Sequence, residues 1–98
     1  ILPPELFDAC HVYHLFCIQT AKRNELIRFL RENGVVTSAH SSQPTHLIKA
    51  FSYLHYKKGD FPYAEKACRT TLFLPHYPEL EKEKVYFICT LVKKFFKR

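Results

Sequence analysis

The sequence predicts an α/β (α+β) fold in which a small sheet of about three strands is covered by helices. Residues 11–19 are rich in β-branched and aromatic side chains, and apolar residues occupy both alternating sets, as in a strand covered on both faces. Residues 82–96 instead place apolar residues three and four positions apart, which is the spacing of an amphipathic helix. Segments of both kinds therefore alternate along one short chain.

A helix and a returning strand are expected after the first strand. Asn24 can cap a helix that runs to about Asn33, and Gly34 can end that helix in the left-handed conformation. Residues 35–39 then return as a second strand. This order gives a β-α-β unit with a short helical crossover beside the sheet.

The middle of the chain predicts a further helix. After the break at Pro44, residues 47–54 predict a short helix or helical turn. Asp60 can cap the next helix, which tolerates Pro62 in its first turn. Its apolar face consists of small residues that would allow close approach to the sheet, namely Ala64, Ala67, Cys68 and Thr71.

The chain is expected to end with a third short strand at residues 72–74 and the helix at residues 82–96. Glutamates at the start of that helix and lysines at its end follow the charge order that the helix dipole favours. The predicted apolar face of this helix comprises Val85, Ile88, Cys89, Val92, Phe95 and Phe96.

Length and composition indicate one packed domain over residues 1–98. The chain is 47% hydrophobic and 15% aromatic, which is far from a disordered composition. It contains no Met and begins at Ile1, so we interpret it as a processed or excised piece. It has no apolar run of membrane-spanning length and no signal pattern, which predicts a soluble protein with no membrane partner. Its four cysteines lack the close pairing of a secreted disulfide framework, which favours a cytoplasmic location.

Charge and metal-ligand spacing argue against two classes of partner. The net charge of +6 would suit an anionic partner, but the basic residues are spread over several elements and alternate with acids, so no nucleic acid is expected. The gaps from Cys10 to His14 and from His40 to His46 are only loosely ligand-like, and no Cys-x2-Cys pair exists, so no metal is predicted. We interpret Cys17, Cys68 and Cys89 as small core residues, and His14 as a hydrogen-bonded residue inside a strand.

The loop at residues 40–46 is the candidate binding segment, because it leaves a strand end where ligands commonly bind in α/β layers. His40, Ser41 and His46 could present imidazole and hydroxyl groups to a phosphate or a sugar. The alternative is that His40 only ends a strand and Pro44 starts a turn. No nucleophile with a neighbouring base is evident, so no catalytic residue is predicted in this chain.

Three segments in order carry a family resemblance. The first motif segment, residues 34–46, reads Gly-Val-Val-Thr-Ser-Ala-His-Ser-Ser-Gln-Pro-Thr-His. The second, residues 59–66, reads Gly-Asp-Phe-Pro-Tyr-Ala-Glu-Lys, and the third, residues 74–80, reads Leu-Pro-His-Tyr-Pro-Glu-Leu. Together they resemble the DegT/DnrJ/EryC1/StrS family of pyridoxal-phosphate enzymes. Three residues of the first segment differ from the family's usual ones, namely Ser41, Ser42 and Thr45.

The resemblance implies that this chain is the C-terminal small lobe of a longer fold-type I aminotransferase that is a homodimer at full length. It implies a parent reaction that moves an amino group, usually from glutamate, onto a nucleotide-linked keto sugar with pyridoxal phosphate as electron sink. In that family the large lobe, absent here, supplies the cofactor-binding residues and the aldimine lysine, so no cofactor-binding residue is expected in this chain. Residues 40–46 would help to contact the sugar nucleotide.

Two alternatives to the enzyme remain open from the sequence. The lobe could act alone as a non-catalytic binding module, or it could belong to a regulatory or structural relative that keeps the fold without transamination. The sequence upstream of Ile1 would distinguish them.

Overall fold

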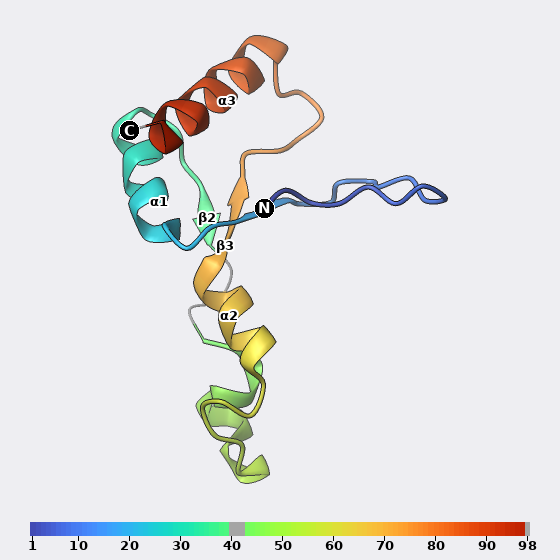
Figure 1. Ribbon diagram of the computed structural model, residues 1–98, viewed down its shortest axis with the longest axis vertical. Helices are drawn as coiled ribbons and strands as arrows, with labels where there is room; N and C mark the ends of the chain where they lie inside the picture. Colours follow the sequence, from blue (N-terminus) through green and yellow to red (C-terminus); the bar gives the residue numbers. More distant parts are fainter. Residues whose placement is uncertain (40–42, 98) are drawn as a thin grey trace.

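The computed structural model describes residues 1–39 and 43–97 and is elongated, with extents of 48 × 36 × 24 Å. A sheet and the two helices α1 (Arg23–Glu32) and α3 (Lys82–Phe96) form its upper part. Helix α2 (Pro62–Thr70) extends below the sheet, and residues 1–15 project sideways as an N-terminal arm (Figure 1).

The sheet has three strands in the order β1-β3-β2, formed by β1 (Phe16–Gln19), β3 (Thr71–Leu74) and β2 (Ser38–Ala39). Both outer strands run antiparallel to β3, with Ile18 of β1 opposite Leu72 of β3. The α1 crossover therefore joins two strands of the same direction that have β3 between them. The predicted fold class, a three-stranded sheet with helices, is confirmed.

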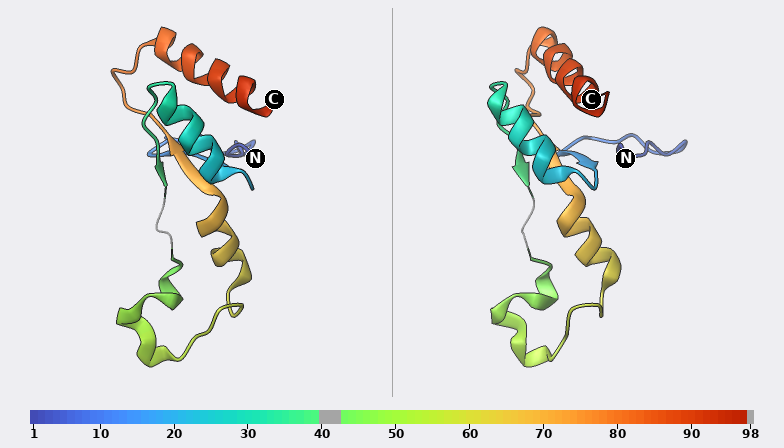
Figure 2. Two further views of the ribbon diagram at one scale, coloured as in Figure 1. Left: turned by 90° about the vertical axis from the view of Figure 1, so that its left-hand side faces the viewer. Right: turned by 60° about the vertical axis from the view of Figure 1, so that its left-hand side comes forward.

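The core lies between the sheet and the two upper helices. Helix α1 lies against β3 and packs on α3 (Figure 2). Residues from both halves of the chain remove their apolar surface from water here, which is the main source of stability for such a layer. The core residues are Ile18, Leu26, Leu30, Val35, Leu72, Ile88, Leu91 and Phe95.

The end of α1 has the geometry that its glycine predicts. Gly34 has a φ of +81°, and its N–H donates to the carbonyl oxygen of Arg31 at 3.0 Å. The N–H of Val35 donates to the carbonyl oxygen of Leu30 at 2.8 Å, and both of these side chains are in the core. This is a Schellman motif with its apolar contact.

The start of α1 differs from the prediction. The helix begins at Arg23, so Asn24 lies inside the first turn and does not cap it. Lys22 occupies the cap position without a side-chain cap hydrogen bond, and its own N–H donates to Oγ1 of Thr20 at 3.1 Å.

The first strand is shorter than predicted, because residues 11–15 belong to the arm. Tyr13 has a φ of +48°, which interrupts an extended strand, and its N–H donates to Nδ1 of His11 at 2.8 Å. Phe16 pairs with Leu74, the last residue of β3. The residue after Leu74 is Pro75, which has no N–H and cannot continue the pairing. The interpretation of His14 as a core strand residue is therefore wrong.

Strand β2 is also shorter than the predicted 35–39. The N–H of Val35 is engaged in the α1 cap, and within residues 1–39 and 43–97 the pairing of β2 with β3 comprises Ser38 and Ala39. The predicted strand at 72–74 is confirmed and begins one residue earlier, at Thr71.

Helix α2 does not cover the sheet, contrary to the prediction. It lies below the sheet and leads directly into β3 (Figures 1 and 2). Its cap position is Phe61, and Asp60 instead accepts the N–H of Lys57 at 2.8 Å, which closes a turn. Ala64 is exposed, and the buried residue of this helix is Glu65.

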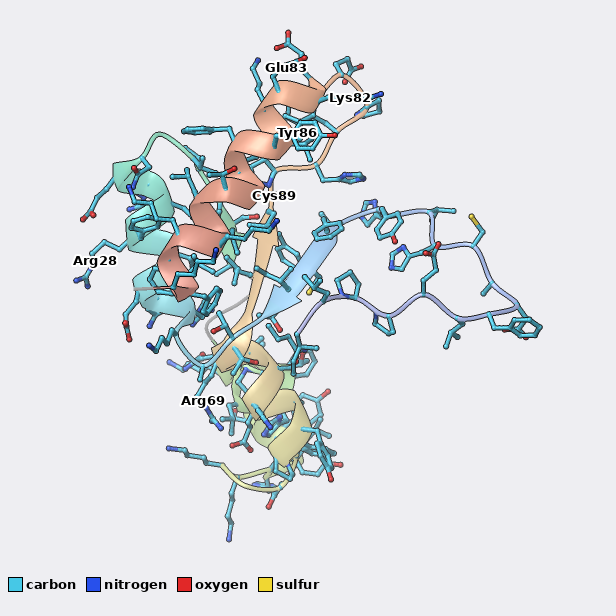
Figure 3. All side chains as sticks on the ribbon, turned by 45° about the horizontal axis from the view of Figure 1, so that its top comes forward. Arg28, Arg69, Lys82, Glu83, Tyr86 and Cys89 are labelled. Atoms are coloured by element: carbon cyan, nitrogen blue, oxygen red, sulfur yellow. The ribbon has the colours of Figure 1, made fainter. Side chains whose placement is uncertain are left out.

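Helix α3 has the predicted bounds, but its buried face is rotated toward Ile88, Leu91 and Phe95. Cys89 is exposed on α3, so its assignment to the core is wrong (Figure 3). Cys17 and Cys68 are half-buried. No helix in the described part of the chain combines the length and the apolar character needed to cross a membrane.

Candidate functional site

The first and second motif segments meet below the sheet. His46, the last residue of the first segment, lies in the 3-10 helix η1 (Thr45–Leu47). Its Nε2 is 3.1 Å from Oε1 of Glu65, which belongs to the second segment and to the first turn of α2. Both side chains are almost fully buried, at 9% and 6% exposure. A buried polar contact thus joins the two segments through residues that lie 19 positions apart.

The chain between them returns to α2 through a tight turn. It passes through the 3-10 helix η2 (Lys49–Leu54) and reaches Gly59, whose φ is +99°. A positive φ of this size favours glycine. The turn directs the N–H of Gly59 to the same Oε1 of Glu65, at 2.6 Å.

Aromatic rings surround the imidazole of His46. The ring of Phe61 lies 4.8 Å from it between centroids, and that of Tyr56 lies 6.5 Å away in an edge-on orientation. Tyr56 and Phe61 also contact each other, at 4.9 Å. These rings pack against the imidazole, whose side chain is 9% exposed.

The carboxylate of Glu65 is stabilised in its charged form. The N–H of Gly59 lowers its pKa most, and burial, which opposes this, has the next largest effect. The hydrogen bond from His46 and its electrostatic attraction, with a smaller contribution from the backbone of Phe61, lower the pKa further. The net result is a pKa below the ordinary value of 4.5, so Glu65 is an anion at neutral pH.

A hollow of about 440 Å³ lies between this cluster and α2, and we call it the α2 hollow. Its walls are mostly apolar and aromatic, with one imidazole among them. Concave apolar surfaces with a few polar groups are typical of small-molecule sites. The lining residues are Pro44, Thr45, His46, Phe51, Leu54, Tyr56, Phe61, Ala64 and Cys68.

Of the predicted substrate-binding residues, His46 lines this hollow. His40 and Ser41 lie outside the described residues. Glu65 was not among the predicted site residues. Its spacing could have indicated it. Glu65 lies four positions after Phe61 and three before Cys68, so it shares a helix face with them.

The described residues do not fit covalent attachment of pyridoxal phosphate. Such attachment needs a lysine in a desolvated site, where its pKa can fall. All ten lysines of the chain are described, and every one of them is exposed. Within residues 1–39 and 43–97, no group of three or more His, Cys, Asp or Glu side chains could hold a metal ion.

Residues 3–93 match the model of the DegT/DnrJ/EryC1/StrS aminotransferase family. The chain is 37% identical over 97 residues to a pleiotropic regulatory protein of Geobacillus stearothermophilus. It is 33% identical over 97 residues to the dTDP-3-amino-3,4,6-trideoxy-alpha-D-glucose transaminase of Streptomyces venezuelae. Each alignment covers 99% of this chain and 26% of the relative.

The crystal structure of S. venezuelae DesV in complex with a ketimine intermediate superposes with a TM-score of 0.93 at 33% identity. The match covers 99% of this chain and 26% of that one. The chain therefore spans about a quarter of the length of the relatives that it matches.

Proposed function

Because this chain belongs to the DegT/DnrJ/EryC1/StrS aminotransferase family, we propose that residues 1–98 are the C-terminal small lobe of a longer nucleotide-sugar aminotransferase. The whole enzyme transfers an amino group from glutamate to a keto sugar nucleotide, with pyridoxal phosphate bound by the large lobe. It works as a cytoplasmic homodimer and binds no nucleic acid.

The observation that carries this proposal is the match to one quarter of a ketimine-bound enzyme structure. Nearly the whole chain superposes on DesV, with a TM-score of 0.93. The named relatives include transaminases for dTDP-linked 3-amino-3,4,6-trideoxyglucose and dTDP-linked 3-amino-3,6-dideoxygalactose. These names support a nucleotide-linked 6-deoxy keto sugar as the substrate.

The chain's own contribution is binding. Residues 40–46, together with the α2 hollow, hold the sugar nucleotide, and the imidazole of His46 hydrogen-bonds it. Because no lysine of this chain is buried, the lysine that carries the cofactor belongs to the large lobe. The lobe alone therefore does not catalyse transamination.

A regulatory role is the second candidate, because the 37% identical relative is named a pleiotropic regulatory protein. A protein of that kind would keep this lobe without using it in transamination. A stand-alone binding module of the same fold is a further alternative. It would require a reading frame no longer than this lobe.

The test is amination by the full-length protein. Purified protein is given pyridoxal phosphate, glutamate, and dTDP- or UDP-linked keto sugars, and the amino-sugar nucleotide is detected by mass spectrometry. We expect the product with at least one dTDP-linked 6-deoxy keto sugar. A folded full-length protein that neither binds the cofactor nor aminates any of these sugars would refute the enzyme and favour the regulatory candidate.

A further inference from the structure

Glu65 is an unusual residue for its place in the fold. It is 5% exposed, and it is the buried residue of α2, whose other inward positions are small or apolar. Burying a carboxylate is costly unless hydrogen bonds compensate for lost water. Two such bonds come from outside the helix, from Gly59 in the turn before it and from His46 in η1.

Both donors converge on the same carboxylate oxygen, Oε1. Because Oε1 also accepts the N–H of Gly59, the turn holds the carboxylate in place. The carboxylate in turn holds the ring of His46 in place. The contact with the tilted ring of Phe61 restricts the imidazole on another side. The orientation of His46 in the α2 hollow thus depends on Glu65.

We propose that Glu65 is a positioning residue that holds His46 with a proton on Nε2, so that the opposite nitrogen serves the sugar nucleotide. Since the carboxylate only accepts hydrogen bonds, Nε2 must donate to it. In the neutral ring Nδ1 is then the acceptor, which suits a hydroxyl group of the sugar. The identity of the ligand rests on the proposed function. The tautomer of His46 does not depend on that function.

Kinetics of the full-length enzyme test the positioning role. We expect Glu65→Ala to raise the KM for the keto sugar nucleotide by about 10-fold, the cost of one misplaced hydrogen bond, with the KM for glutamate unchanged. Glu65→Gln should recover most of the loss, because its amide oxygen can accept from both donors. Glu25→Ala, which removes an exposed glutamate of α1, is the control and should leave both constants unchanged.

A double-mutant cycle separates positioning from a general structural role. In a His46→Ala background, Glu65→Ala should raise the same KM by less than about 2-fold, because there is no ring left to position. The inference is overturned if the full effect persists without His46, or if Glu65→Ala lowers only the melting temperature.

The tautomer is measured directly in full-length protein labelled with 15N-histidine. Long-range proton–nitrogen correlations of His46 should show the proton on Nε2 in the wild type and in Glu65→Gln, and a mixture of tautomers in Glu65→Ala. A wild-type ring with its proton on Nδ1 alone would overturn the inference, even if Glu65→Ala fails to fold. This readout also stands if no keto sugar is aminated, so the failure of the proposed function would be recognised separately.

Discussion

A guanidinium nitrogen of Arg23 lies 3.2 Å from the carbonyl oxygen of Cys68 and 3.5 Å from that of Thr71. The half-buried side chain thereby joins the first turn of α1 to the last turn of α2 and the start of β3. A cation at the carbonyl end of a helix is also favoured by the helix dipole. Arg23 therefore joins three elements of the fold and is not only a surface charge.

We predict that Arg23→Ala destabilises the chain by about 1–2 kcal/mol, because the substitution removes a charged donor from partly buried carbonyl groups. Urea unfolding of the purified chain measures the change. Arg28→Ala on the same helix is the control, since Figure 3 shows Arg28 pointing away from α1. Equal stability of the two variants would contradict this role for Arg23.

The cap of α1 makes a second prediction. Gly34→Ala should cost about 1 kcal/mol, because the φ of +81° is strained for a residue with a Cβ. No atom lies within 4 Å of the added Cβ, so any loss comes from the backbone conformation. Gly34→Asn should lose less, since Asn tolerates the left-handed region. If thermal melting shows both variants as stable as the wild type, this cap contributes little to stability.

The pH dependence of stability follows from Glu65. Its pKa is lowered by folding, so the folded chain binds the proton more weakly than the unfolded chain. The stabilisation is therefore complete above the ordinary pKa of 4.5 and is lost as the pH falls through the lowered value. Wild type and Glu65→Gln should differ most in free energy of unfolding near neutral pH and converge in acid. A gap that stays constant down to about pH 2 would contradict the assignment.

The N-terminal arm predicts self-association of the isolated chain. Phe7 and Val12 expose 106% and 87% of their reference surface, and Ile1 exposes 86%. Several large apolar side chains exposed on one segment favour association with another molecule. Sedimentation velocity should show larger species as concentration rises, and Phe7→Ser with Val12→Ser should reduce them. Tyr63→Ser, an exposed substitution on α2, is the control. A wild type that stays monomeric at every concentration would refute this prediction.

The parts of the fold that depend on local signals could be predicted from the sequence. Gly34 specified the end of α1, and the three and four spacing specified α3, because both signals act within a few residues. The lengths of β1 and β2 could not be predicted in the same way. Both lengths depend on pairing with β3, which is distant in sequence. That pairing ends at Leu74, because the next residue, Pro75, has no N–H.

The same limit applies to the candidate site. His46 was selected because it lies in a polar loop after a strand. Its partner Glu65 was missed, since only the turn at Gly59 brings α2 back against η1. The rotation of α3 that exposes Cys89 also depends on contact with α1. The spacing of apolar residues within α3 does not predict that contact.

The most direct test of the central claim compares the two half-reactions of the full-length protein in the variant His40→Ala. The claim is that residues 40–46 bind the sugar nucleotide, and an imidazole contact of this kind is worth on the order of 1–3 kcal/mol when charge-assisted. We predict that the half-reaction with the keto sugar nucleotide loses roughly 10- to 100-fold in kcat/KM, while the half-reaction with glutamate is unchanged. If the variant loses only thermal stability, with both half-reactions unchanged, His40 merely ends a strand and the claim is wrong.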